Sequence, residues 1–258
     1  MKEMPLAGRA IVVTRPARQA DGLASLIRAA GGDAILFPVI EIRDAEDPGP
    51  LHAVIEALDG FEVAVFISPN AVNMAMTAIT ARRRLPPGLV VAAIGPGSVR
   101  ELARFGVGEV IAPSGRSDSE ALLELPQLGE LRGKRVVVFR GQGGRELLGD
   151  TLQARGALVE YAECYRRTRP ESDPAPLLDA WRRNGLSAIT VTSSEGLRHL
   201  FDLVGTAGHA PLVKTPLFAP HPRIAHAARE LGFATVIATE PGDEGLIAAL
   251  VDYFSARR

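Results

Sequence analysis

Short apolar runs alternate along the chain with longer stretches in which apolar residues recur every three or four positions. Residues 63–67 form one such run, which ends abruptly at Ser68, Pro69 and Asn70. The next stretch, 71–79, places apolar residues three and four apart. This pattern predicts a buried strand, a tight turn and an amphipathic helix.

The same alternation predicts the rest of the first half of the chain. Strands are expected at 11–13, 35–40, 63–67, 90–94 and 110–111. Helices are expected at 20–27, where Gly31 and Gly32 follow, at 99–105, where Gly106 follows, and from 120 onwards. Strands that alternate with helices imply crossover connections, so the predicted fold class is α/β with mainly parallel sheets.

A repeat runs through the chain. The segment "GRAIVVTR" at 8–15 returns as "GKRVVVFR" at 133–140, and the offset, 133 minus 8, is 125 residues. The same offset pairs Ser68 with Ser193, Pro96 with His221, and Asp118 with Asp243. Because one offset persists over the whole length, the sequence predicts two copies of one supersecondary plan.

Composition narrows the class of protein. The 258 residues suit two domains, and 47% of them are hydrophobic, enough for sizeable cores. The formal net charge of -1 indicates neither a nucleic-acid-binding surface nor an anionic-membrane surface. Cys164 is the single cysteine, which excludes an intramolecular disulfide and a cysteine-rich metal site. Without a signal-like N-terminus or a long apolar run, a cytoplasmic protein is expected.

The predicted strand-to-helix junctions carry the candidate chemistry. Ligands of parallel α/β folds bind at the carboxyl edge of the sheet, where these junctions meet. "TRPARQ", "SPNAV", "GPGSV" and "RGQGGR" lie at such junctions, and "TSSEGL" and "PHPRI" occupy matching places in the second copy. Their serines, prolines and glycines are also ordinary helix caps, so each junction has a purely structural interpretation. A functional interpretation is that several helix N-termini together bind anions.

Other motifs are less specific. "GPGSV" and "GQGGR" match neither a P-loop nor a complete dinucleotide fingerprint. Arg15 and Arg140 occupy equivalent strand ends, with Arg18 and Arg145 a few residues on, and they fit either carboxylate binding or surface salt bridges. The five histidines show no metal-ligand spacing, so no metal is expected.

The ordered series of motifs resembles the uroporphyrinogen-III synthase family along nearly the whole chain. The matching stretches include "VVTRP", "FISPNAV", "AIGPGSVRELARFG", "GKRVVVFRGQGGRELLGDTLQARGALVEYAECYRR" and "ITVTSSEGLRHLF". The resemblance implies two similar parallel-sheet α/β domains joined by a two-stranded antiparallel β-ladder, with the chain crossing twice. It places 1–37 and 170–258 in one domain, 44–162 in the other, and linker strands at 38–43 and 163–169.

The resemblance also implies the reaction. A linear tetrapyrrole with eight carboxylates, hydroxymethylbilane, is cyclised to uroporphyrinogen III with loss of water and inversion of ring D, in tetrapyrrole biosynthesis. A monomer without a cofactor is expected, supplied with substrate by hydroxymethylbilane synthase. Tyr165 aligns with the tyrosine that the family favours, as a neutral proton donor to the departing hydroxyl, although it also fits a packing tyrosine between domains.

A flexible octa-acid needs many weak anion-binding groups rather than one strong ion pair, and helix N-termini supply these without net charge. The expected substrate-binding residues are Arg15, Ser68, Pro69, Asn70, Gly95, Gly97, Ser98, Arg140, Gly141, Gly143, Thr192, Ser193, Ser194, His221 and Arg223. The chain departs from many relatives at "PHPRI", where they have Gly-Pro-Thr-Thr. Two alternatives stay open: a non-catalytic two-lobed binding module for an acidic small molecule, and a nucleotide-dependent enzyme.

Overall fold

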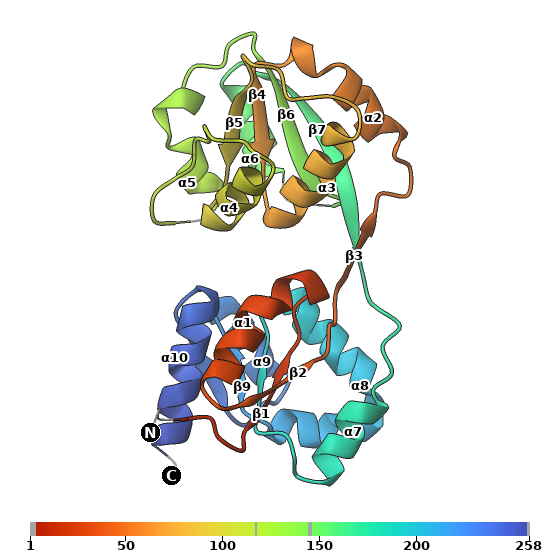
Figure 1. Cartoon of the computed structure of the whole chain (residues 1–258), viewed down its shortest axis with the longest axis vertical. Helices are drawn as coiled ribbons and strands as arrows, with labels where there is room; N and C mark the ends of the chain where they lie inside the picture. The colour runs from red at the N-terminus through yellow and green to blue at the C-terminus, as the bar shows by residue number, and fades with distance from the viewer. Residues whose placement is uncertain (1–3, 117, 144–145, 257–258) are drawn as a thin grey trace. The chain divides into compact units, whose positions relative to one another are not determined.

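The computed structural model describes residues 4–116, 118–143 and 146–256. The chain forms two compact units (Figure 1). Unit 1 takes in the chain up to Glu41 and again from Thr168, and unit 2 takes in Ile42–Arg167. Unit 1 is therefore assembled from both ends of the sequence, whereas unit 2 is one continuous segment.

Unit 1 is built on a five-stranded sheet in the order β10-β9-β8-β1-β2, whose neighbouring strands pair in parallel. The strands are β1 (Ala10–Val13), β2 (Asp33–Leu36), β8 (Ala188–Thr190), β9 (Leu217–Ala219) and β10 (Val236–Ala238). The helices are α1 (Ala17–Ala29), α7 (Ala175–Arg182), α8 (Ser194–Lys214), α9 (Pro222–Glu230) and α10 (Gly242–Ser255).

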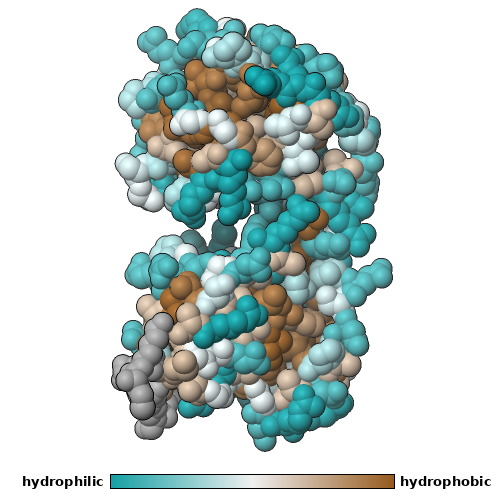
Figure 2. All heavy atoms as spheres, in the orientation of Figure 1, coloured by the Kyte–Doolittle hydropathy of each residue, from teal (hydrophilic) through white to brown (hydrophobic). Residues whose placement is uncertain are grey.

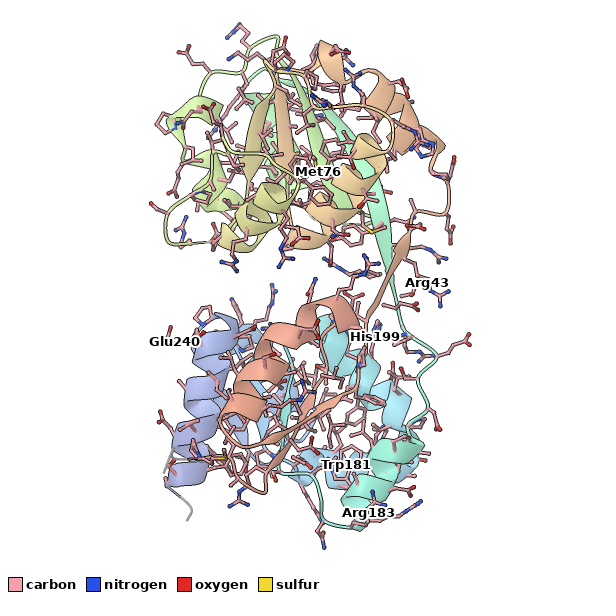
Figure 3. All side chains as sticks on the ribbon, in the orientation of Figure 1. Arg43, Met76, Trp181, Arg183, His199 and Glu240 are labelled. Atoms are coloured by element: carbon pink, nitrogen blue, oxygen red, sulfur yellow. The ribbon has the colours of Figure 1, made fainter. Side chains whose placement is uncertain are left out.

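Both faces of the unit 1 sheet are covered. Ile11 and Val13 share a core with α1 and α10, and Val12 between them is buried on the opposite side. On that side α7 packs on α8, and α8 packs on α9. Trp181 of α7 lies within this unit (Figure 3) and donates a hydrogen bond from its indole nitrogen to Thr215 Oγ1, at 2.9 Å.

Unit 2 has a second five-stranded sheet, in the order β3-β7-β6-β4-β5. The pairs β4–β5, β4–β6 and β6–β7 are parallel, and the direction of β3 stays a prediction. The strands are β3 (Glu41–Asp44), β4 (Val63–Phe66), β5 (Val90–Ala93), β6 (Arg135–Gly141) and β7 (Leu158–Thr168). The helices are α2 (Gly49–Glu56), α3 (Pro69–Thr80), α4 (Pro96–Arg104), α5 (Ser119–Leu123) and α6 (Leu147–Ala154), with 3-10 turns at Leu58–Gly60 and Pro126–Leu128.

The unit 2 sheet lies between two apolar cores. Helices α2, α3 and α4 pack on one face through Phe66 and Phe139, while α5 and α6 pack on the other through Val65 and Val138. On the visible face of each unit, hydrophobic atoms gather in the middle and hydrophilic atoms surround them (Figure 2). The side chains of β6 alternate between these two cores, with Val137 and Phe139 in the first and Val136 and Val138 in the second.

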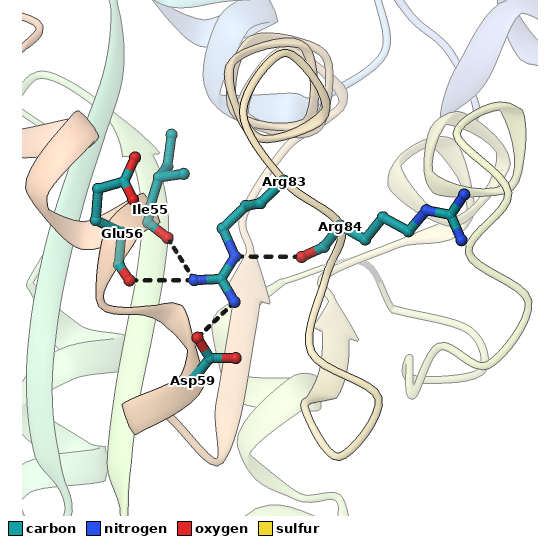
Figure 4. A network of polar contacts seen from close by, with 5 residues as sticks. All are labelled: Ile55, Glu56, Asp59, Arg83 and Arg84. Carbon is teal, nitrogen blue, oxygen red and sulfur yellow. Dashed lines mark hydrogen bonds and ion pairs between the residues drawn. The ribbon is translucent and has the colours of Figure 1, made fainter.

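Arg83 caps the carboxyl end of α2. Its guanidinium donates to the carbonyl oxygens of Ile55 and Glu56 at 3.4 and 3.1 Å, and to Asp59 at 2.6 Å (Figure 4). The last carbonyls of a helix have no partner within the helix, so an arginine placed there satisfies them. This network is structural and lies outside the candidate site.

The structure confirms the predicted α/β class and parallel sheets, and it shows the repeat as a shared strand order. The order β9-β8-β1-β2 in unit 1 matches β5-β4-β6-β7 in unit 2. The predicted strand at 110–111 is a single bridge between Ile111 and Ala92, at the place where unit 1 has β10.

Two predicted correspondences were wrong. Gly95 and His221 are the residues that cap α4 and α9, so Pro96 is equivalent to Pro222 rather than to His221. Asp118 caps α5, whereas Asp243 lies in the first turn of α10. A one-residue insertion between the copies explains the first error, because the constant offset does not accommodate it.

The predicted extended segment 35–40 is also different in the structure. β2 ends at Leu36, and β3 begins only at Glu41. Between them the Phe37 N–H still donates to the Val13 carbonyl at 3.0 Å, but the Val39 N–H donates to the Thr14 carbonyl at 3.2 Å, outside the register of β1 and β2. No helix in the described part of the chain is long and apolar enough to cross a membrane.

Candidate functional site

The carboxyl edge of the unit 2 sheet brings several predicted residues together. Ser68 follows β4, Gly95 follows β5, and Gly141 is the last residue of β6. Ser68 caps α3, since its hydroxyl oxygen accepts a hydrogen bond from the Ala71 N–H at 3.0 Å. Gly95 caps α4 with its backbone alone. The local prediction of helix caps at both junctions is therefore correct.

The N-termini of α3 and α4 lie side by side. A Cβ added at Gly97 would lie 3.2 Å from Cγ of Pro69, so a larger residue at 97 would press on the first residue of α3. Asn70 is the second residue of α3, and Ser98, the third of α4, is buried. Two positive helix ends thus share one edge, the arrangement expected of an anion site.

Tyr165 belongs to β7 and owes its direction to an irregularity in the ladder. Arg140 pairs with Glu163 but Gly141 pairs with Tyr165, which leaves Cys164 as an extra residue on β7. Such a bulge interrupts the alternation of faces along a strand. Tyr165 consequently lies in the same core as Cys164, on the side of α3.

The Tyr165 hydroxyl lies among polar groups at the start of α3. Its oxygen is 3.2 Å from Ser68 Oγ, and Nη2 of Arg167 donates to it at 3.4 Å. Tyr165 itself is 0% exposed. Gly141 makes room for the ring, because a Cβ there would lie 2.6 Å from ring atoms Cε2 and Cζ. Of the predicted residues, Ser68, Gly141 and Tyr165 therefore form one contact group.

Arg140 faces the other side of the same sheet. It is buried, its guanidinium lies 4.6 Å from the centre of the Tyr161 ring, and its Nε donates to the Gly141 carbonyl at 3.4 Å. Burial raises the pKa of Tyr161; Arg140 opposes this rise, and Asp150 and Glu146 add to it. Arg140 and Tyr165 are thus not brought together.

A pocket of about 770 Å³ opens on the Arg140 side of unit 2. Gln142 and Gly143 line it together with Arg140, and Gly143 has a positive φ of 71° that favours glycine. Four carboxylates also line it: Glu46, Asp47, Glu146 and Glu163. This mixed charge suits a polyanion less well than the uncharged helix ends on the Tyr165 side do.

Unit 1 has a comparable edge. Ser193 caps α8 by accepting from the Gly196 N–H at 2.9 Å, with Thr192 before it. The hydroxyl of Ser194, the first residue of α8, is buried and has no hydrogen-bond partner among the described residues. Arg15 forms an ion pair with Asp243 of α10. The predicted binding role of Arg15 therefore requires a ligand to compete with this carboxylate.

The remaining predicted residues lie outside the contact group of Ser68, Gly141 and Tyr165. His221 caps α9 by accepting from the Arg223 N–H at 3.1 Å, and both side chains are exposed. Arg18 is exposed as well, and Arg145 lies outside the described residues. Among the described residues no group of three or more His, Cys, Asp or Glu side chains could hold a metal ion.

Sequence analysis missed Arg167, which contacts the Tyr165 hydroxyl, and the space that Gly141 leaves for the ring. The repeat contained a usable signal. The offset of 125 pairs Tyr165 with Ile40, so the position is apolar in one copy and carries a hydroxyl in the other. A polar group that only one copy acquires is a candidate for function rather than for architecture.

Comparison with solved structures supports the fold. A mutant uroporphyrinogen III synthase from Thermus thermophilus superposes with a TM-score of 0.62 at 20% sequence identity, covering 97% of this chain and 100% of that one. The uroporphyrinogen-III synthetase from Helicobacter pylori superposes with a TM-score of 0.58 at 15% identity, covering 95% and 99%. At such low identity these likenesses concern the fold alone.

Comparison of sequences goes further. The uroporphyrinogen-III synthase of Salmonella typhimurium is 35% identical over 243 residues, which cover 93% of this chain and 99% of that protein. The enzyme of the same name from Escherichia coli is 34% identical with the same coverage. The family model described as uroporphyrinogen-III synthase HemD matches residues 21–248. The chain therefore belongs to the uroporphyrinogen-III synthase family.

Proposed function

We infer that the protein cyclises hydroxymethylbilane to uroporphyrinogen III, with inversion of ring D and loss of water. Membership of the family and the close match in length to named uroporphyrinogen-III synthases support this activity. Nothing in these comparisons favours a non-catalytic binding module. The reaction consumes no oxidant, reductant or second substrate, since the products balance as one macrocycle and one water.

The helix N-termini at the two sheet edges are proposed to bind the carboxylates of the substrate. In unit 2 these are the first turns of α3 and α4, with Ser68, Asn70, Gly97 and Ser98. In unit 1 it is the first turn of α8, where the Ser194 hydroxyl is buried and has no hydrogen-bond partner in the described part of the chain. Backbone N–H groups and the helix dipole favour anions there without adding net charge, in keeping with a formal charge of -1.

Tyr165 is proposed as the proton donor. The single observation that carries this role is the placement of its hydroxyl beside the cap of α3, 3.2 Å from Ser68 Oγ. As the C–O bond of the substrate breaks, the phenol proton passes to the leaving hydroxyl and forms water. The phenolate regains a proton when the closing macrocycle releases one. Ser68 and Arg167 can donate hydrogen bonds to the phenolate oxygen in the meantime.

The test is to incubate the purified protein with hydroxymethylbilane and to resolve uroporphyrinogen isomers I and III. Isomer III without an added cofactor is expected, because the uncatalysed reaction closes the ring without inversion. Tyr165→Phe, which removes only the hydroxyl, should lower kcat about 100-fold, the lower range for loss of a general acid. A protein that yields isomer I alone is not a synthase, and full activity in Tyr165→Phe removes the proposed donor.

We also propose that the protein works as a cytoplasmic monomer that receives its substrate from hydroxymethylbilane synthase. The supporting argument is chemical: hydroxymethylbilane closes spontaneously to the wrong isomer, so a short transfer time favours isomer III. Sedimentation of the protein with and without that synthase measures both the oligomeric state and the association.

A further inference from the structure

Helices α3 and α4 of unit 2 pack against each other, and their first turns are proposed above to bind carboxylates (Figure 1). α4 has nine residues, of which Ser98 and Leu102 are buried and Val99 is partly buried against the same core. Apolar contacts are not directional, so they determine the rotation of a short helix about its axis less firmly than a hydrogen bond does. The direction of the N–H groups of α4 therefore depends on its polar contacts as well.

A hydrogen bond joins the two helices about one turn behind their N-termini. The side-chain amide of Asn73 on α3 donates to a carboxylate oxygen of Glu101 on α4, at 3.0 Å. The other oxygen of Glu101 accepts from Arg104 at 3.0 Å, and the Glu101 side chain is only 17% exposed. Because the acceptor is charged and largely withdrawn from solvent, this bond is stronger than one between neutral groups. It connects the helices about 4.5 Å along the axis from Asn70 and from Ser98.

The equivalent helices of unit 1, which the structure describes in full, cannot form the same link. α8 starts at 194 and α3 at 69, an offset of 125, whereas α9 starts at 222 and α4 at 96, an offset of 126. Asn73 and Glu101 therefore correspond to Arg198 and Ala227, and a methyl group accepts no hydrogen bond. The proposed site uses both helix ends in unit 2 but only that of α8 in unit 1. The link thus occurs where two helix ends have to act together.

We propose that Glu101 is a positioning residue, which holds the N-termini of α3 and α4 at the spacing that two carboxylates of the substrate require. The inference rests on the proposed function, because it takes these helix ends to bind the substrate. The N–H groups of a helix end do not turn independently of the helix, so a displaced α4 misdirects all of them at once. The carboxylates are present in the substrate and in the transition state alike. Loss of the link therefore weakens both complexes equally, which raises KM and leaves kcat unchanged.

The experiment measures kcat and KM with hydroxymethylbilane, together with the free energy of unfolding, for three variants. Glu101→Ala should raise KM about fivefold, with kcat changed by less than about twofold. Glu101→Gln keeps an oxygen that accepts from Asn73, so its KM should stay within about twofold of the wild-type value. Arg104→Ala is the matched control, because it removes the ion pair from the same carboxylate but leaves the link between the helices, so KM should not change.

A double-mutant cycle identifies the link itself. Asn73→Ala should raise KM to a similar extent as Glu101→Ala, since either substitution breaks the same bond. The two substitutions together should then raise KM little more than one of them does. Because the cycle measures the coupling between the two side chains, it does not depend on the other contacts of either one.

A wild-type KM in Glu101→Ala, with only the free energy of unfolding lowered, would show a purely structural link and overturn the proposal. Independent effects of Asn73→Ala and Glu101→Ala would overturn it too, as would an equal rise of KM in Arg104→Ala or a fall in kcat at constant KM. If Glu101→Ala does not fold, the KM of Asn73→Ala decides the case. The two proposals fail separately: wild-type protein that forms no isomer III ends the proposed function, whereas an unaltered KM in an active Glu101→Ala enzyme ends only this inference.

Discussion

Both units place a capping serine at the start of an equivalent helix, but they differ in the side chain beside that serine. In unit 2 Ser68 caps α3 and contacts the Tyr165 hydroxyl. In unit 1 Ser193 caps α8, and the offset of 125 places Ile40 where unit 2 has Tyr165. Ile40 is buried near that cap, since a Cβ added at Gly196 would lie 3.6 Å from its Cδ1. The serine belongs to the architecture shared by both units, and the phenol of unit 2 is the addition that the proposed proton transfer would use.

The two equivalent arginines also differ between the units, in the side chains that they contact. Arg15 of unit 1 pairs with Asp243, whereas Arg140 of unit 2 is buried against Tyr161. Arg15 lies two residues after the end of β1, and Arg140 is the next-to-last residue of β6, so similar positions near the ends of inner strands lead to different contacts. Equivalent positions in the repeat therefore lie at similar places in the fold, while the partner of each side chain depends on the strand or helix that lies beside it.

Gly141→Ala should have the largest effect of the substitutions that probe this difference between the units. Unit 1 carries Pro16 at the position equivalent to Gly141, which is possible beside Ile40, but a Cβ at 141 would lie 2.6 Å from the Tyr165 ring. The ring must move away from Ser68, so kcat should fall at least about tenfold. Gly88→Ala is the matched control, because nothing lies within 4 Å of a Cβ at Gly88.

Steady-state kinetics of both glycine variants, with thermal unfolding as a check on folding, provide the measurement. Equal activity of Gly141→Ala and Gly88→Ala would mean that the position of the Tyr165 ring is not constrained by the β6 backbone. The close contact would then have no role in turnover.

Ser68→Ala and Ser193→Ala separate the capping role of both serines from the contact that Ser68 makes with Tyr165. Each substitution removes one helix cap, so each should cost about 1 kcal/mol of unfolding free energy, measured by urea titration. Only Ser68→Ala also removes a partner of the Tyr165 hydroxyl, so its kcat should fall further, by several-fold relative to Ser193→Ala. Asp118→Ala, which uncaps α5 outside the site, controls for capping alone.

A common loss of kcat in Ser68→Ala and Ser193→Ala would contradict this expectation. It would mean that the contact between Ser68 and Tyr165 adds nothing to turnover beyond the cap. Ser68→Thr, which keeps a hydroxyl, should restore most of the activity if the contact matters.

The parts of the fold that sequence predicts are those that depend on local patterns. All four residues of β4 are buried, so an uninterrupted apolar run was sufficient to locate it. Ser68 and Pro69 mark the start of α3 through the N–H groups that a helix leaves unpaired. The end of β2 was misplaced because Phe37 and Val39 continue the apolar pattern, although the Val39 N–H donates to the Thr14 carbonyl, outside the register in which β2 pairs with β1.

The site depends on pairing between distant strands, which a single sequence does not reveal. Strict alternation along β7 would place Tyr165 on the same face as Tyr161 and Glu163. The bulge opposite Arg140 and Gly141 reverses this and turns Tyr165 toward Ser68. The junction residues were therefore predictable as caps, while their contact with the phenol was not.

Cys164 also differs between the units, because the equivalent residue of unit 1 is Val39. Its replacement should have the smallest of the expected effects, a change in how stability depends on pH. Burial raises the pKa of the Cys164 thiol to about 12 from an ordinary value of 9.0. Between those two values the unfolded chain loses the thiol proton while the folded chain keeps it. The unfolded state then binds fewer protons, so the free energy of unfolding falls as pH rises through this window.

Cys164→Val, which copies unit 1, removes this contribution and should make the alkaline loss of stability less steep. The difference between wild type and variant cannot exceed about 1.4 kcal/mol per pH unit, because a single proton is involved. Urea titrations below pH 9 and above it measure the two slopes. Parallel slopes would indicate that the thiol meets solvent in the folded protein, which would also contradict the close packing of the bulge that directs Tyr165.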